Sequence, residues 1–366
     1  MNTFRILCSS ALLSAWLLCP SAAHAITGYT FTDLGPVPEN PQLNRLVGGG
    51  AINNAGEIVF YTDSAGNNRS PQAYTLIGGV FQPLPQLLPD NPYTRAFDLN
   101  EAGQIVGAAM IGRDPNNGFQ PIFAPVMWQG GAITDLRTLG LDGAVAINEA
   151  GHILTGSHLY AGGTSTKIPI NNFFGAQLND SDTVVGWTIG GPFNIPYLWN
   201  PVTGTQQLPS LQPNTSASML DINNNNLIVG ESVGSGGFMH AVYFDGALHD
   251  LNPLIGGLTS AAAAVNDANH IVGTSDAAHQ IWVYKGNQML FLQDYVPDRP
   301  FQSPPKLSVV LGINDLGQIA VAGPDDASGD SRYHIYLFTP VPEPSTLVLA
   351  GLGLASVLIV ARRRQR

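Results

Sequence analysis

The sequence predicts an all-β fold: a seven-bladed β-propeller-like ring of repeats in which one blade is stunted. Three observations support this: a short pattern that recurs seven times, a spacing that suits four short strands per copy, and complementary ends of the repeat array. The composition agrees, because 366 residues include 41 Gly and 27 Pro but only 11% charged side chains. Such a turn-dense chain is more typical of exported all-β proteins than of helical ones.

The recurring pattern is a pair of apolar segments separated by a turn that begins with Asn. The leading residues of the seven copies are Asn53, Asn100, Asn148, Asn179, Asn223, Asn266 and Asn314. The residues three positions later are Gly56, Gly103, Gly151, Asp182, Asn226, Asn269 and Gly317, all of types that tolerate a left-handed backbone. This pattern predicts a β-hairpin closed by a four-residue turn in every copy.

The spacing between copies indicates the architecture. The leading Asn residues are 47, 48, 31, 44, 43 and 48 positions apart. In most copies the hairpin is followed by an aromatic strand such as Tyr197-Leu198-Trp199, a Gly-containing turn and a short Leu-bearing strand. Four short strands of this total length suit a propeller blade, and the shortest interval, which lacks the aromatic strand, predicts the stunted blade. A right-handed β-solenoid is the main alternative, but its coils are shorter, at roughly 20–30 residues.

The two ends of the array complement each other. Tyr29–Gly35 resembles the last strand of a repeat, and the seventh copy stops after Ile335–Phe338, before its own last strand. We therefore expect the N-terminal strand to complete the last blade, which would close the ring and leave no open sheet edge.

The C-terminus is a candidate anchoring tail. Leu347–Ala361 is a run of fifteen residues that are all apolar except Ser356. It would span about 22 Å as a helix, against a hydrocarbon core of about 30 Å. The basic residues that would stop it on the cytoplasmic side are Arg362, Arg363, Arg364 and Arg366. Taken alone, these features predict a short transmembrane helix, and an ordinary C-terminal membrane anchor remains open.

The residues before this run narrow the interpretation. Pro342, Glu343 and Pro344, followed by the short apolar segment and the terminal Arg cluster, resemble the PEP-CTERM sorting signal of Gram-negative bacteria. The resemblance implies recognition and processing by exosortase, a membrane protease, in bacteria that typically make an exopolysaccharide.

The N-terminus has the form of a signal peptide. Arg5 precedes an apolar stretch, and Ala23 and Ala25 supply the small residues that signal peptidase requires, so we expect cleavage after Ala25. Both cysteines, Cys8 and Cys19, lie in this peptide, so the mature chain would contain no disulfide and no cysteine nucleophile. The predicted domains are a signal peptide over 1–25, a repeat domain over 26–340 and a sorting tail over 341–366.

Charge excludes some partners of the repeat domain. Residues 26–341 carry 10 basic and 25 acidic side chains, which leaves a net charge of −15. An acidic body without a basic cluster argues against nucleic acid, and against anionic polysaccharide held by simple charge attraction.

The repeats also resemble the extracellular HAF type, named for a His-Ala-Phe-like strand. The matching residues are Asp33-Leu34-Gly35, the Ile-Asn-x-x-Gly-x-Ile-Val-Gly hairpin and His240-Ala241-Val242, whereas Gln72-Ala73-Tyr74 departs from the triplet. The resemblance implies an exported bacterial protein without an assigned catalytic activity.

Residues suited to catalysis or metal binding form no recognisable motif. The histidines show no metal-ligand spacing, and His152 and His270, in the same slot after the turn, are expected to be exposed. Asp180–Asp182 and Asp325–Asp330 offer carboxylates for Ca²⁺ but lack a closing Glu, so turn chemistry is favoured. We therefore expect no metal, no cofactor and no catalytic residue.

Aromatic residues and long loops are the remaining candidates for a binding surface. The residues at the same phase of the repeat are Trp128, Trp199, Trp282 and Tyr243, for which core packing is favoured over sugar stacking. Leu84–Tyr93 and Arg113–Phe123 are the best candidate loops.

These observations together predict an exported, exosortase-sorted protein of the bacterial surface or extracellular matrix, with a non-catalytic binding or structural role that includes association with exopolysaccharide. The expected partners are exosortase, signal peptidase, the membrane through the C-terminal helix, and a polysaccharide or another surface protein. Two alternatives stay open: a secreted carbohydrate-active hydrolase or lyase with carboxylates at the propeller rim, and a passive matrix component.

Overall fold

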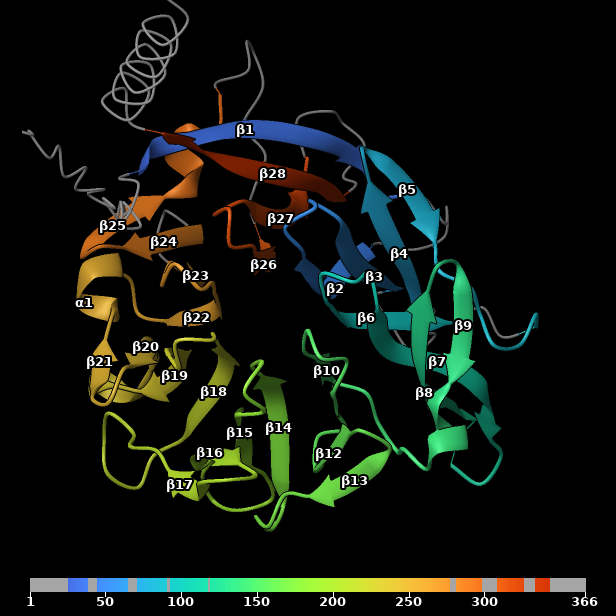
Figure 1. Ribbon diagram of the computed structural model, residues 1–366. Coiled ribbons are helices and arrows are strands. Elements are labelled where there is room, and N and C mark those ends of the chain that lie inside the picture. Colours follow the sequence, from blue (N-terminus) through green and yellow to red (C-terminus); the bar gives the residue numbers. More distant parts are fainter. Residues whose placement is uncertain are drawn as a thin grey trace, which may run out of the picture. The chain divides into compact units, whose positions relative to one another are not determined.

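The computed structural model describes residues 26–38, 45–64, 71–90, 93–117, 119–276, 281–297, 308–325 and 333–342. Residues 27–341 form one compact unit, which is a ring of seven four-stranded antiparallel sheets, or blades (Figure 1). The predicted seven-bladed β-propeller is confirmed, and the solenoid alternative is wrong.

Blades 1 to 6 follow the chain, and each uses four consecutive strands. Blades 1 and 2 consist of β2 (Arg45–Ile52), β3 (Ile58–Ser64), β4 (Gln72–Ile77), β5 (Val80–Pro83), β6 (Thr94–Leu99), β7 (Ile105–Asp114), β8 (Gln120–Gln129) and β9 (Ala132–Asp135). Blades 3 and 4 consist of β10 (Ala146–Ile147), β11 (Ile153–Leu154), β12 (His158–Ala161), β13 (Thr164–Lys167), β14 (Phe173–Leu178), β15 (Val184–Thr188), β16 (Pro196–Asn200) and β17 (Gly204–Gln207). Blades 5 and 6 consist of β18 (Ala217–Ile222), β19 (Ile228–Val233), β20 (Met239–Phe244), β21 (Leu248–Asp250), β22 (Ser260–Val265), β23 (Ile271–Ser275), β24 (Ile281–Lys285) and β25 (Gln288–Phe291). The short helical turns are Leu136–Leu139, Ser235–Gly237, α1 (Asn252–Ile255) and Leu292–Tyr295.

Blade 7 closes the ring with strands from both ends of the chain. Its order is β1-β28-β27-β26, in which β1 (Ile26–Pro36) lies beside β28 (Tyr333–Pro342), followed by β27 (Ile319–Pro324) and β26 (Val309–Ile313) (Figure 1). The predicted pairing of the two ends is therefore confirmed. A sheet completed in this way leaves neither end of the repeat array as an unpaired edge.

The hydrophobic core lies between neighbouring blades. At the junction of blades 7 and 1, Leu311 and Ile335 pack in one buried cluster with Ile52 and Phe60. Trp282 of blade 6 is fully buried and packs with residues of blade 5. Trp128 and Trp199 are also buried, so the core interpretation holds for all three tryptophans. Tyr243 is half-buried and stacks on His249, with ring centroids 4.4 Å apart.

Blade 3 is short but has all four strands. Its first two strands, β10 and β11, have two residues each. The predicted absence of a third strand is wrong, because β12 occupies that place. Its buried Leu159 packs in the core cluster that also contains Trp199 of blade 4. Tyr160 of the same strand pairs with Ile153, as Trp199 pairs with Val184 in blade 4, so β12 also has the aromatic residue of the pattern.

A β-bulge in the first strand explains a glycine that recurs in the second. In six blades the pairing of the first two strands shifts register, for example between Met219 and Asp221 in blade 5. The bulge brings the Ser218 carbonyl oxygen so close that a Cβ on Gly230 would lie 2.1 Å from it. Only glycine fits there without a shift of the backbone.

The antiparallel strand order gives the ring two distinct faces. We call one the turn face, because the turns between first and second strands and between third and fourth strands lie on it. The other, the loop face, carries the connections between second and third strands and between blades. Both predicted loops, Leu84–Tyr93 and Arg113–Phe123, belong to the loop face. The second is mostly strand rather than loop, because β7 and β8 stay paired as far as Asp114 and Gln120.

Several predicted segments lie outside the described residues. They are the signal peptide with Ala23 and Ala25, Glu343 and Pro344, the apolar run Leu347–Ala361, and Arg362, Arg363, Arg364 and Arg366. Pro342 is the last residue of β28. Within the part of the chain that the structure describes, we find no helix of sufficient length and apolarity to span a membrane.

Candidate functional site

Seven equivalent turns on the turn face surround the centre of the ring. In each, the leading Asn closes its own hairpin, as in blade 5: Asn223 N–H donates to the Leu227 carbonyl (3.1 Å), and Leu227 N–H donates to Asn223 Oδ1 (2.8 Å). The fourth turn residue has a positive φ in all seven copies, from 59° at Asp182 to 77° at Gly56 and Gly317. The predicted turn geometry is therefore confirmed.

The leading Asn side chains also join one blade to the next. All seven are between 1% and 4% exposed. At six of the seven junctions, Nδ2 donates to the carbonyl oxygen of the leading Asn in the following blade, at 2.8–3.2 Å. At the junction of blades 1 and 2, Asn53 Nδ2 instead lies 3.5 Å from Glu57 Oε2. Asn recurs here because one short side chain must accept a bond within its turn and donate one to the neighbouring blade.

The residues that follow the leading Asn form a second ring, which we call the rim. Its members are Asn54, Glu101, Glu149, Asp180, Asn224, Asp267 and Asp315. Each side chain accepts a hydrogen bond from the backbone N–H of the preceding rim residue, at 2.8–3.0 Å for the shorter oxygen. The circuit closes where Asp315 N–H donates to Asn54 Oδ1. The rim carboxylates are thus acceptors in a structural circuit.

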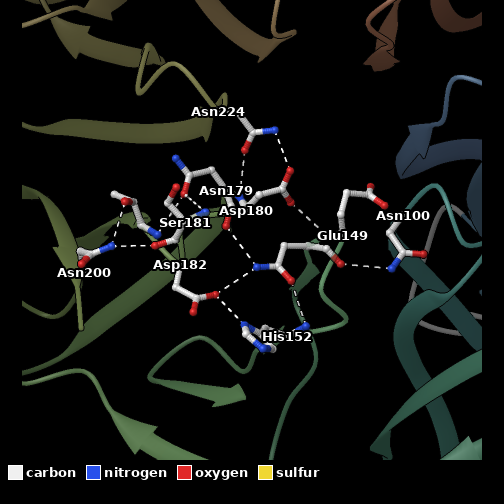
Figure 2. Close-up of polar contacts among 11 residues, drawn as sticks. Asn100, Glu149, His152, Asn179, Asp180, Ser181, Asp182, Asn200 and Asn224 are labelled. Atoms are coloured by element: carbon white, nitrogen blue, oxygen red, sulfur yellow. Dashed lines mark hydrogen bonds and ion pairs between the residues drawn. The ribbon is translucent and has the colours of Figure 1, made fainter. Parts of the chain in front are cut away.

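Figure 2 shows how blades 3 and 4 meet at this circuit. Asp180 Oδ1 accepts from Glu149 N–H (3.0 Å), and its Oδ2 accepts from Asn224 Nδ2 (2.8 Å). Asp182 Oδ1 lies 2.8 Å from His152 Nδ1. The same oxygen accepts a hydrogen bond from Asn148 Nδ2 (3.0 Å). Asp180 and Asp182 therefore join the turns of neighbouring blades through hydrogen bonds.

The two histidines after the turns are less exposed than expected. His270 is 9% exposed, and burial, together with nearby Lys285, lowers its pKa to about 4. His152 is half-buried against Asp182 of the next blade. The expectation of exposure is wrong because the slot after each turn faces the neighbouring turn rather than solvent.

The two rings surround a central cavity of about 280 Å³. Asp98 and Asp221 also line it, from the first strands of blades 2 and 5. Each lies immediately after the bulge of its strand, which sets the direction of the side chain. The equivalent residue is Gln177 in blade 4, and it is Ala or Gly in the other four blades.

Among the titratable groups that line this cavity, Asp98 and Asp221 have the pKa values that are shifted furthest from the usual value for Asp. Burial raises the pKa of Asp98 to about 6, although Leu99 N–H and Ile147 N–H both donate to its carboxylate at 2.9 Å. Burial likewise raises the pKa of Asp221 to about 7, and the nearby charge of Asp98 adds to the effect. Both carboxyl groups bridge two blades, because Asp221 also accepts from Val265 N–H.

A larger cavity, of about 500 Å³, opens beside the rim between blades 4 and 5, and we call it the groove. Its lining residues are Thr183, Leu198, Asn200, Thr203, Ile222, Asn225, Asn226, Leu227, Ile228, Phe244, Asp245, Gly246 and Asn269. Asn223 and Asn224 of the blade 5 turn line the central cavity, whereas Asn225 and Asn226 of the same turn line the groove. Both cavities therefore lie on the turn face.

The groove combines amide, hydroxyl and apolar groups. Four Asn side chains and two Thr hydroxyls supply donors and acceptors, and Phe244 with three Leu or Ile residues of the strands supplies apolar surface. Asp245 is its one ionisable residue. This composition suits a neutral ligand rich in hydroxyl groups.

A comparison with protein families identifies the C-terminal tail. Residues 340–364 match the PEP-CTERM protein-sorting motif. The match confirms the resemblance read from Pro342, Glu343 and Pro344, and it indicates export and sorting to the cell envelope or surface by exosortase. The PEP-CTERM motif covers only the tail and does not describe the propeller.

The propeller itself resembles solved structures only distantly. "YCF48 bound to D1 peptide" is 15% identical with a TM-score of 0.48, covering 88% of this chain and 100% of that one. TolB from Acinetobacter baumannii is 10% identical with a TM-score of 0.36, covering 82% of this chain and 56% of that one. Trypanosoma rangeli sialidase in complex with sialic acid is 8% identical with a TM-score of 0.36, covering 86% and 57%. No curated protein matches the chain.

Sequence reasoning missed the groove and the two acids of the central cavity. The turns that form the groove were identified as hairpins, but nothing in the repeat pattern shows which blades leave space between them. For Asp98 and Asp221, a signal was present: both stand two positions before the leading Asn, where most copies have Ala or Gly. A charged residue in a slot otherwise filled by small residues indicates a special environment.

Proposed function

We propose that the propeller is a non-catalytic binding module of the cell surface or extracellular matrix, and that the groove on its turn face binds neutral polysaccharide. The groove itself carries this proposal. Polysaccharide chains present many hydroxyl groups with apolar ring faces between them, and the groove offers amides and hydroxyls beside Phe244. The net charge of −15 on residues 26–341 favours a neutral chain over an anionic one.

The roles of the rim carboxylates support a binding module over an enzyme. A glycosidase needs two carboxyl groups that are free to protonate the leaving group and to attack or activate water. At the rim, by contrast, each carboxylate accepts a backbone N–H bond that joins two blades, as Glu101 does for Asn54 and Asp267 for Asn224. Mutation of these groups would disturb the ring rather than a reaction.

We further infer that the repeats are of the HAF type. His240 Nδ1 lies 2.9 Å from Asp250 Oδ2 in blade 5, and His334 Nδ1 lies 3.0 Å from Asp33 Oδ1 in blade 7. These contacts join the first residue of the His-Ala-Phe-like strand to the Asp of the Asp-Leu strand. A single contact thus accounts for two separate elements of the repeat pattern.

The groove proposal can be tested by blocking the groove. Thr203 is an exposed residue of its wall, and Thr164 of blade 3 is exposed after the corresponding turn but lines no part of the groove. We expect saturable binding of a neutral glucan to the purified protein, weakened at least about tenfold by Thr203→Trp and unchanged by Thr164→Trp. Equal affinity in all three proteins would overturn the assignment to the groove, and binding only to another envelope protein would favour a protein ligand.

A hydrolase is the second candidate, and the two acids of the central cavity favour it. The raised pKa values of Asp98 and Asp221 would let either group hold a proton near neutral pH, as a general acid must. We expect no release of new reducing ends from glucans by the protein. Turnover that disappears in Asp98→Asn or Asp221→Asn, while glucan binding persists, would make the protein an enzyme.

A further inference from the structure

We propose that Asp33, Asp325 and His334 form a site for a divalent transition-metal cation of the Zn²⁺ class, in the blade that closes the ring. One carboxylate oxygen of each Asp and one ring nitrogen of His334 all lie within 4.8 Å of one another. Imidazole with carboxylate oxygens is a ligand set that Zn²⁺ and its neighbours accept.

The three residues come from three different strands of blade 7. Asp33 lies in β1, His334 lies near the start of β28, and Asp325 directly follows β27. They meet on the loop face, opposite the groove, because β1 and β27 end there and β28 begins there. A cation held by all three would therefore tie the N-terminal strand to the C-terminal ones.

His334 provides the observation that separates this cluster from an ordinary group of acids. The residue is 8% exposed, and its Nδ1 lies 3.0 Å and 3.1 Å from the two oxygens of Asp33. Its Nε2 is buried and has no hydrogen-bond partner among the described residues. The buried imidazole is thus not fully satisfied by hydrogen bonds, and Nδ1, which faces Asp33, is the nitrogen placed to share a cation with that carboxylate.

Blade 5 contains the same pair without the third ligand. His240 and Asp250 correspond to His334 and Asp33, with the ring nitrogen and carboxylate oxygen 2.9 Å apart. The position that corresponds to Asp325, by the register of the second and third strands, is Gly234. Asp325 is 2% exposed, so blade 7 has added a buried carboxylate where blade 5 has no side chain. The pair alone is a structural element of the repeat, and the third residue converts it to a cation site.

This proposal differs from the expectation, based on the sequence, that the protein has no metal site. The reason is distance along the chain, because Asp33 and His334 are 301 positions apart and no local spacing could reveal the site. It does not depend on the proposed function, because the groove lies on the other face.

The test measures Zn²⁺ binding by the purified protein and by three variants. We expect the parent protein to bind one Zn²⁺ saturably, with an apparent Tm about 5 °C higher at a hundredfold excess over Kd. Asp325→Asn and His334→Gln should lose both the binding and the shift, whereas Asp250→Asn, the matched change in blade 5, should keep both. Ca²⁺, which prefers oxygen ligands, should not reproduce the shift.

Two results would overturn the site. One is the absence of saturable Zn²⁺ binding by the parent protein, and the other is equal binding in Asp325→Asn and the parent. If either variant fails to fold, Co²⁺ in the parent protein decides the question by X-ray absorption. One imidazole in the cobalt coordination sphere supports the site, and coordination by oxygen alone rejects it.

Discussion

Asn314 of the last blade donates its side-chain Nδ2 to the carbonyl oxygen of Asn53 in the first blade, at 3.0 Å. The contact spans 261 positions of sequence, yet it is the same contact that Asn266 makes with Asn314 and Asn223 with Asn266. The ring is thus closed at its centre by the residue that also closes each hairpin. Because each repeat contains both its own turn and its contact with the next blade, the ring needs no additional structure to join the last blade to the first.

Removing one of these side chains should destabilise the whole ring. In Asn266→Ala, the Asn314 carbonyl would lose a donor at 2.8 Å and the His270 N–H would lose an acceptor at 2.8 Å, both in a buried setting. We expect a loss of about 2 kcal/mol in the free energy of unfolding, measured by urea denaturation. Asn116→Ala, at an exposed turn, should change stability by less than about 0.5 kcal/mol and serves as the control.

The bulge and its glycine give a second prediction. Gly230→Ala would place a Cβ 2.1 Å from the Ser218 carbonyl oxygen and 2.8 Å from the Met219 Cα, both backbone atoms that cannot rotate away. We expect a loss of about 2–3 kcal/mol in denaturant melts. In Gly191→Ala the nearest atom to the new Cβ would lie at 3.5 Å, so that variant should match the parent. Equal stability of the two variants would show that the bulge relaxes more easily than its geometry suggests.

Much of the fold could be predicted because each repeat contains residues that determine its own hairpin turn. Asn at the first turn position and a left-handed residue at the fourth fix a hairpin locally, and all seven have the predicted geometry. The offset between Tyr29–Gly35 and the last copy predicted the closing blade. The third strand of blade 3 was missed because the interval from Asn148 to Asn179 is short and β12 has only four residues, although its Tyr160 pairs with Ile153 as Trp199 pairs with Val184 in blade 4.

The candidate site was harder to predict, for a different physical reason. The groove lies between blades 4 and 5, and its lining residues come from strands and turns of both blades, with Asn269 of blade 6. Its shape therefore depends on packing between repeats rather than within one. Carboxylates at the propeller rim were candidates for catalysis. Only the structure shows that the carboxylates of Glu149 and Asp180 accept hydrogen bonds from backbone N–H groups of adjacent blades. Sequence could place these acids at equivalent positions without showing their partners.

The tail gives a prediction about the mature protein. The PEP-CTERM match over residues 340–364 leads us to expect cleavage near Pro342–Thr346 after export, with loss of the apolar run. Intact-mass spectrometry of the protein from its native host should find a C-terminus before Leu347. Arg366 should be retained in a strain without exosortase, and its retention in a strain with active exosortase would contradict the prediction. Neutral replacements of Arg362, Arg363, Arg364 and Arg366 should weaken the membrane stop.

The two acids of the central cavity, Asp98 and Asp221, give a prediction about pH. The folded-state pKa of Asp221 is about 7 and that of Asp98 about 6, whereas an unfolded Asp titrates near about 4. Because both values are raised, the folded state holds these protons more tightly than the unfolded state. Stability from these groups is therefore fully present below about pH 4 and is lost as the pH rises to about 7.

The expected size of this loss, and its measurement, follow from the linkage between proton binding and folding. Each group should lower the free energy of unfolding by at most about 1.4 kcal/mol per pH unit between its two pKa values. Other acids act in the opposite direction, such as Asp276, whose pKa is lowered by backbone N–H bonds from Thr259 and Leu258. The informative quantity is therefore the difference between Asp221→Asn and the parent, measured by urea denaturation from pH 4 to pH 8. We expect the stability of the variant relative to the parent to rise between pH 4 and pH 7 and then to level off. The lost acceptor for Val265 N–H adds only a constant offset to this difference. A difference that stays flat across the range would mean that Asp221 titrates near its unfolded pKa and that the central cavity is better solvated than its burial indicates.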